Sequence, residues 1–182
     1  MPDIWEIAAI LAKLVLYIGV LGSVGLVIIR TVFGDLVSPL SDRIRLQATL
    51  LAGGALAAAV LAFMLRGAAL TGGAGGMTDP EMLGLLWQTP VGDALVYRSL
   101  GTILILLGLS IPRVGKGIAL AGGLIALWSF TQIGHVPALE VTGVRLLLLL
   151  HLLGIALWVG ILGPLHAQST WLAQPLWDTD LD

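Results

Sequence analysis

Residues 7–29, IAAILAKLVLYIGVLGSVGLVII, form an apolar stretch in which Lys13 is the only charged side chain. A helix needs about 20 mostly apolar residues to cross the hydrocarbon core of a bilayer. Four further stretches of this kind cover residues 46–65, 94–111, 117–133 and 144–165. Pro112 ends the third and Pro137 ends the fourth, because proline disfavours helical geometry in the residue before it. The sequence therefore predicts an all-α, polytopic transmembrane helical bundle with about five spans.

The composition supports this fold class and excludes several functions. The chain is 58% hydrophobic and only 11% charged, whereas soluble domains carry roughly a quarter charged residues. Its 182 residues leave little beyond one transmembrane domain, which we expect to cover residues 1–182. The absence of cysteine excludes disulfides, thiolate metal sites and cysteine nucleophiles. A net charge of −2 gives no reason to expect a nucleic-acid partner.

The basic residues predict the orientation of the chain. Cytoplasmic loops of membrane proteins are enriched in Lys and Arg. The first and third loops carry Arg30, Arg43, Arg45, Arg113 and Lys116, against Arg66 and Arg145 beside the second and fourth loops. This imbalance predicts the N-terminus outside and the C-terminus inside. The long loop over residues 67–92 is then external, with a short interfacial helix over residues 81–88.

Two histidines in apolar surroundings are the main candidates for chemistry. His135 lies where the fourth span ends, and His151 lies within the fifth. Polar, metal-capable side chains at membrane depth are costly and commonly functional. We expect His151 inside the bundle as a metal or haem ligand, the alternative being a hydrogen bond to a neighbouring helix. His135 is either a second ligand or an ordinary interfacial histidine.

The external loop adds two soft donors, and the spans add two cations. Met77 and Met82 flank acidic residues, and thioether sulfur suits Cu(I), although Met82 also fits a packing role under the interfacial helix. Lys13 and Arg98 are expected to extend toward the outer surface, with pairing to Asp93 or Glu140 as the alternative for Arg98. No hydrolase or phosphate-loop motif is present, which predicts a protein that is not an enzyme.

Residues 89–165 resemble the copper-resistance protein D (CopD) family of inner-membrane proteins, and the first span looks similar to that of the family. The motifs that carry the resemblance are Thr89-Pro90-Val91-Gly92 leading into a helix with Arg98, Gly134-His135 at a helix exit, and His151 with Trp158 and Gly160.

The resemblance implies a multi-pass protein of the bacterial inner membrane that binds or takes up copper, as Cu(I) or Cu(II). It implies His135 and His151 as ligands, and a periplasmic copper-binding partner of the CopC type. Two features depart from the family. Leu148 stands where members often have an acidic residue, and longer members have about eight spans. A homo-oligomer would then be one way to enclose a copper path.

Two other functions remain open at this stage. A small b-type haem protein also uses histidine ligands in a helical bundle. A non-catalytic membrane partner subunit would need only close helix packing, for which Gly19, Gly22 and Gly25 provide a narrow helix face.

Overall fold

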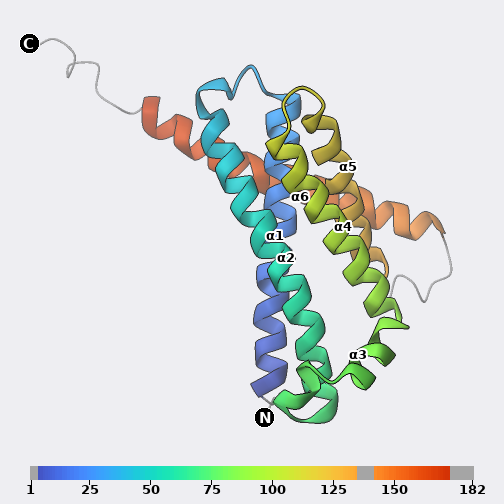
Figure 1. The fold of residues 1–182 in the computed structure, drawn as a ribbon. Helices are drawn as coiled ribbons and strands as arrows, with labels where there is room; N and C mark the ends of the chain where they lie inside the picture. Colours follow the sequence, from blue (N-terminus) through green and yellow to red (C-terminus); the bar gives the residue numbers. More distant parts are fainter. Residues whose placement is uncertain (1–3, 135–141, 173–182) are drawn as a thin grey trace, which may run out of the picture.

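A computed structural model describes residues 4–134 and 142–172, with side chains for residues 4–134 and 143–166, and the regular structure of these ranges is helical (Figure 1). In chain order the elements are α1 (Ile4–Val32), η1 (Ser38–Leu40), α2 (Ser41–Thr71), η2 (Ala74–Met77), α3 (Pro80–Trp87), α4 (Pro90–Ser110), α5 (Gly115–Trp128), η3 (Ser129–Thr131) and α6 (Thr142–Leu172).

Each predicted span corresponds to one helix, so the expectation of an all-α membrane bundle is confirmed. Within the described ranges, α1, α2, α4 and α6 are long and apolar enough to cross a membrane. The fourth predicted stretch corresponds to Gly115–Thr131, a shorter apolar helix below that length. Its last turn tightens into the 3₁₀ helix η3, where the Ser129 hydroxyl donates to the carbonyl oxygen of Ala126 at 2.6 Å.

Local capping explains why the helices begin and end beyond their most apolar residues. The Thr89 side chain accepts a hydrogen bond from the Val91 amide, and Pro90 occupies the first turn of α4. Asp79 caps α3 in the same way, which confirms the short helix expected in the external loop. At the end of α2, Gly72 adopts the left-handed conformation with φ 71°, which costs glycine little.

Glycines set the closeness of the helix contacts. Helix α1 packs against α2, α5 and α6, and α4 packs against α2 and α5. A Cβ atom on Gly101 would lie 2.6 Å from the carbonyl oxygen of Gly122, and the reverse distance is the same. Such contacts let α4 and α5 approach backbone to backbone, the mode by which transmembrane helices associate without a hydrophobic driving force.

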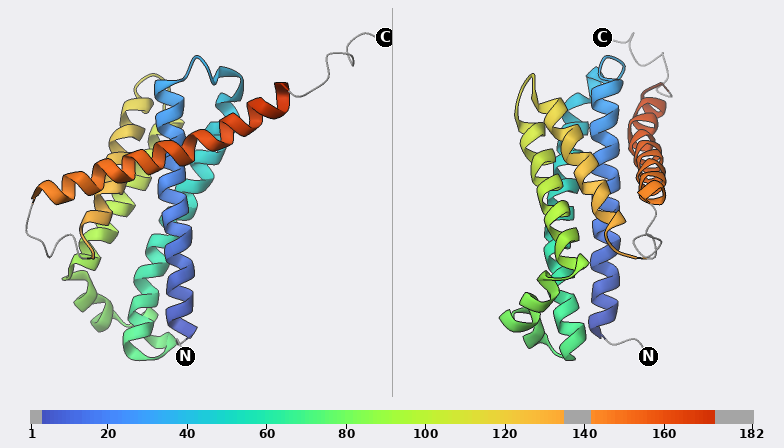
Figure 2. Two further views of the ribbon diagram at one scale, coloured as in Figure 1. Left: turned by 180° about the vertical axis from the view of Figure 1, so that it is seen from behind. Right: turned by 90° about the vertical axis from the view of Figure 1, so that its right-hand side faces the viewer.

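Helix α6 crosses the bundle obliquely instead of running alongside α1 (Figure 2). The crossing point is built from Gly25 of α1 and from Ala156 and Gly160 of α6. A Cβ on Gly25 would lie 2.9 Å from the Cα of Gly160. Of the three glycines predicted to form a narrow face on the first span, Gly25 contacts α6, whereas Gly19 and Gly22 contact Leu51 or Ala55 of α2.

The two ends of the bundle differ in what they carry. The start of α1, the η2–α3 segment and the start of α4 lie at one end, here called the α3 end (Figure 1). The turns over residues 33–40 and 111–114 lie at the opposite end, here called the η1 end. The two loops richest in Lys and Arg thus share one end. The positive-inside rule would place that end in the cytoplasm.

Candidate functional site

The two external methionines lie at the α3 end of the bundle. Met77 closes η2 and Met82 belongs to α3, and both side chains are half-buried. The backbone around them packs closely against α2. A Cβ atom added to Gly67 would collide with the carbonyl group of Gly76. The structure therefore places both thioethers on a compact turn against the end of α2.

The first histidine candidate, His135, lies outside the described residues. The last described residue before it is Gly134, which has φ 110° and lines a cavity at the α3 end of the bundle.

The second histidine, His151, is exposed on α6. The residues of α6 that are buried toward α1 are Leu152, Ala156 and Gly160, spaced four apart along one helix face. Trp158, which shares the His151 face, is 66% exposed. The expectation that His151 lies inside the bundle is therefore wrong for a single copy of the chain. The small side chains of Ala156 and Gly160 permit the close crossing, and they direct the histidine outward.

The described residues contain no cluster of histidine and carboxylate side chains that could by itself complete a metal site. Within them no group of three or more His, Asp or Glu side chains could hold a metal ion. His151 and His166 are about 22 Å apart along α6, at about 1.5 Å per residue. One haem cannot take both of these histidines from the same copy as its axial ligands.

Arg98 makes both a hydrogen bond and a cation–π contact with the end of the 115–131 segment. Its Nε donates to the Oγ of Ser129 at 3.2 Å, and its guanidinium carbon lies 5.1 Å from the ring centroid of Phe130. The Phe130 ring stacks on Tyr17, with centroids 4.7 Å apart. Arg98 is therefore directed into the bundle, and the expectation that it extends toward the surface is wrong. No ion pair joins it to Asp93 among the described residues, and Glu140 lies outside them.

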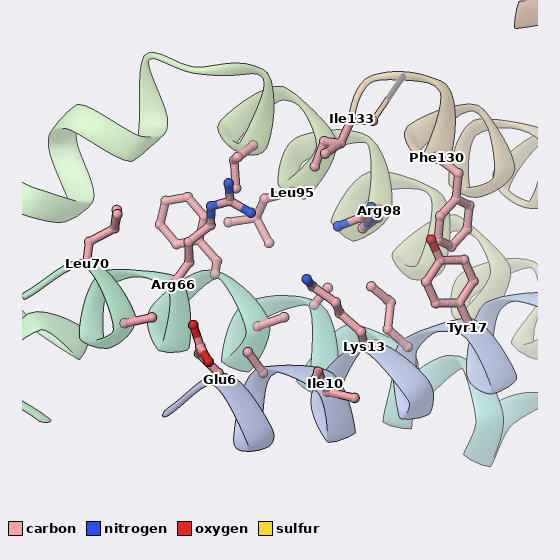
Figure 3. A pocket seen from close by; sticks show the side chains of 18 residues that line it. Glu6, Ile10, Lys13, Tyr17, Arg66, Leu70, Leu95, Arg98, Phe130 and Ile133 are labelled. Atoms are coloured by element: carbon pink, nitrogen blue, oxygen red, sulfur yellow. The ribbon is translucent and has the colours of Figure 1, made fainter. Parts of the chain in front are cut away.

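A cavity of about 620 Å³ adjoins Arg98. Lys13 of α1, Arg66 of α2 and Arg98 of α4 direct their nitrogen atoms into it (Figure 3). Glu6 and Tyr17 also line it, and most of the remaining lining side chains are apolar. Phe130, near the end of the short segment Gly115–Thr131, forms part of the cavity wall.

This convergence was missed in the sequence. The sequence places Lys13 and Arg98 in separate spans and Arg66 beside a loop, and no motif connects the three. The available signal was topological: Lys13 follows the start of one span, Arg66 precedes the end of the next, and Arg98 follows the start of the third. Antiparallel neighbours bring such positions to one end of a bundle.

A family model described as copper resistance protein D-like, N-terminal domain, matches residues 1–144. The matched range contains Met77, Met82 and His135 and stops before His151. No curated protein and no solved structure matches the chain.

Proposed function

The chain belongs to the copper resistance protein D-like family of multi-pass membrane proteins, and we propose that it binds copper on the periplasmic side of the inner membrane and passes it inward. The proposed ligands are Met77, Met82, His135 and His151. The family match carries the proposal, because it covers 144 of 182 residues and three of the four ligands.

The chemistry of these side chains fits a transported ion. Thioethers and neutral imidazoles are the donors in this cysteine-free chain that suit Cu(I), and imidazole also accepts Cu(II). Conduction requires sites that bind strongly enough to capture the ion and weakly enough to release it. A few neutral ligands meet this requirement better than a closed thiolate cage.

The copper site is proposed to lie outside the cationic cavity. Lys13, Arg66 and Arg98 repel a free copper ion, and this repulsion is strong in surroundings of low dielectric constant. The two methionines instead lie on the η2–α3 segment, and neither of them lines that cavity. Capture at the turn places the first proposed ligands, Met77 and Met82, outside the lining of the cavity, and transfer to His135 is proposed to follow.

His151 requires a covering partner to act as a ligand. It is exposed on α6, and Leu147 and Trp158 beside it are 66% exposed each. We propose that a second copy of the chain covers this face and encloses the imidazole. A periplasmic copper-binding protein of the CopC type is the proposed donor of the ion.

Copper retention by purified variants tests the proposal. Detergent-solubilised protein is loaded with Cu(I), washed, and analysed for copper by elemental mass spectrometry. The variants are His135→Ala, His151→Ala and the double substitution Met77→Leu/Met82→Leu. The matched controls are His166→Ala and Met64→Leu, which change the same residue types outside the proposed ligand set.

Retention of copper by the wild type and both controls, with loss in the ligand variants, supports the proposal. Equal copper in all six proteins contradicts the ligand assignment. A visible spectrum of the same samples examines the alternative function, because a strong absorption band near about 400 nm would identify bound haem instead.

A further inference from the structure

The cationic cavity contains none of the proposed copper ligands in its described lining, and its chemistry points to a different ligand. We propose that it binds a phosphate group, with Lys13, Arg66 and Arg98 as its recognition residues, and that the phosphate is that of a membrane phospholipid at the outer surface.

The charge of the cavity calls for an anion. Its lining carries three cations and one described carboxylate, that of Glu6, which gives a formal charge of +2. The ion pair found among the described residues joins Arg45 to Asp42 at the other end of the molecule, and none involves Lys13, Arg66 or Arg98. Three cations directed into one space repel each other, and a bound anion removes that repulsion.

The types of side chain match a phosphate oxyanion. Arg98 keeps its guanidinium plane fixed through Ser129 and Phe130, so its remaining N–H groups are presented in a fixed direction. A fixed guanidinium favours bidentate contacts with phosphate oxygens, and lysine adds a mobile point charge. Because the three groups come from α1, α2 and α4, one ligand would contact three helices at once.

The depth of Arg66 matches the headgroup level. Helix α2 has 31 residues. At about 1.5 Å per residue it exceeds the hydrocarbon core of about 30 Å by roughly 16 Å. Arg66 lies five residues before the end of α2 at Thr71, or about 8 Å along the axis. With the excess divided between both ends, Arg66 lies at the boundary between hydrocarbon and headgroups.

The walls of the cavity favour a lipid over a free ion. Ile10, Leu70 and Leu95 line it together with other apolar side chains, and its volume exceeds what a single phosphate requires. A phospholipid would place its phosphate among the three cations and its glycerol and acyl carbons along these apolar walls.

Native mass spectrometry of the detergent-purified full chain tests the proposal. The protein is titrated with phosphatidylglycerol, and with diacylglycerol as the matched lipid without phosphate. The variants are Lys13→Gln, Arg66→Gln and the double substitution. The control, Arg43→Gln, removes an exposed arginine at the η1 end. Each interfacial cation contributes about fivefold to the affinity for an anionic lipid, so the double variant should bind about 25-fold more weakly.

The outcomes distinguish a lipid phosphate from a soluble one and show whether the proposal holds. Phosphatidylglycerol binding that falls in the double variant, is unchanged in Arg43→Gln and resists millimolar inorganic phosphate identifies a lipid site. The same pattern with displacement by inorganic phosphate identifies a soluble phosphate as the ligand. Equal binding by wild type and the double variant, or equal binding of diacylglycerol, overturns the proposal. Copper retention is measured on the same variants, and its preservation separates this site from the copper ligands.

Discussion

The crossing of α6 over α1 predicts a large difference between two identical substitutions on one helix. Gly160 and Gly154 both lie in α6. A Cβ on Gly160 would lie 2.6 Å from the Cα and 2.7 Å from the carbonyl oxygen of Gly25, whereas a Cβ on Gly154 meets nothing within 4 Å. Gly160→Ala and Gly154→Ala therefore differ only in the contact that they create.

The distances set the magnitude. Carbon atoms in good contact are about 3.5–4.0 Å apart, so the new methyl group is too close by about 1 Å. The obstructing atoms are backbone, which cannot yield by changing rotamer, and overpacking of this kind costs about 1–3 kcal/mol. Both variants gain about 0.5–1 kcal/mol from the better helix propensity of alanine. That gain cancels between them, and Gly160→Ala should be less stable than Gly154→Ala by about 1–3 kcal/mol.

Unfolding in mixed micelles with increasing sodium dodecyl sulfate, followed by circular dichroism, measures the difference. The expected order of stability is Gly154→Ala at or slightly above wild type and Gly160→Ala below both. Equal stability of the two variants would refute the backbone contact between α1 and α6. The outward placement of His151 would then also be wrong, because the contact at Gly160 determines which face of α6 meets α1.

Three further predictions concern the polar contacts and the exposed face of α6. Arg98→Leu removes the hydrogen bond to Ser129 and the contact with Phe130, so thermal unfolding should show a free energy of unfolding lower by about 2 kcal/mol. Arg98→Lys should restore part of this loss. An unfolding transition of Arg98→Leu that equals that of the wild type would contradict the inward placement of Arg98. Thr89→Ala removes the cap of α4 and should lower the free energy of unfolding by about 1 kcal/mol in the same assay, whereas Thr89→Ser should keep most of the wild-type stability. Gly154→Cys should cross-link two copies through a bismaleimide in membranes, because the chain has no other cysteine and this position lies on the face assigned to a second copy. Gly117→Cys on α5 is the control, and cross-linking that is no stronger at position 154 than at position 117 would argue against that interface.

The helical fold was predictable because apolar length dominates the sequence. Every predicted span overlaps one helix, and Pro112 does follow the end of α4. The helix bounds were less accurate, because caps such as Thr89 and Gly72 extend helices into polar sequence that hydropathy does not include. The shortness of the fourth predicted stretch was missed for a related reason. Phe130 and Ile133 keep the stretch apolar on average, although the polar residues Ser129, Thr131 and Gln132 mark where the backbone tightens into η3.

The candidate site was only partly predictable. Helical periodicity groups His151 with Trp158 but does not say whether that face meets the bundle or the surroundings. The spacing of Ala156 and Gly160, a small-residue pair four apart, indicates the contact face and gives the better criterion in a membrane. The cationic cavity depends on three helices meeting at one end, and no single stretch of sequence contains it.

X-ray absorption at the copper edge tests the proposed copper ligands most directly. It is measured on the Cu(I)-loaded wild type, Met77→Leu/Met82→Leu and the Met64→Leu control. We predict sulfur and nitrogen scatterers around copper in the wild type and in the control, and loss of the sulfur contribution in the double variant. A wild-type spectrum without sulfur ligands, or one that is unchanged by the double substitution, would contradict copper capture at the η2–α3 turn.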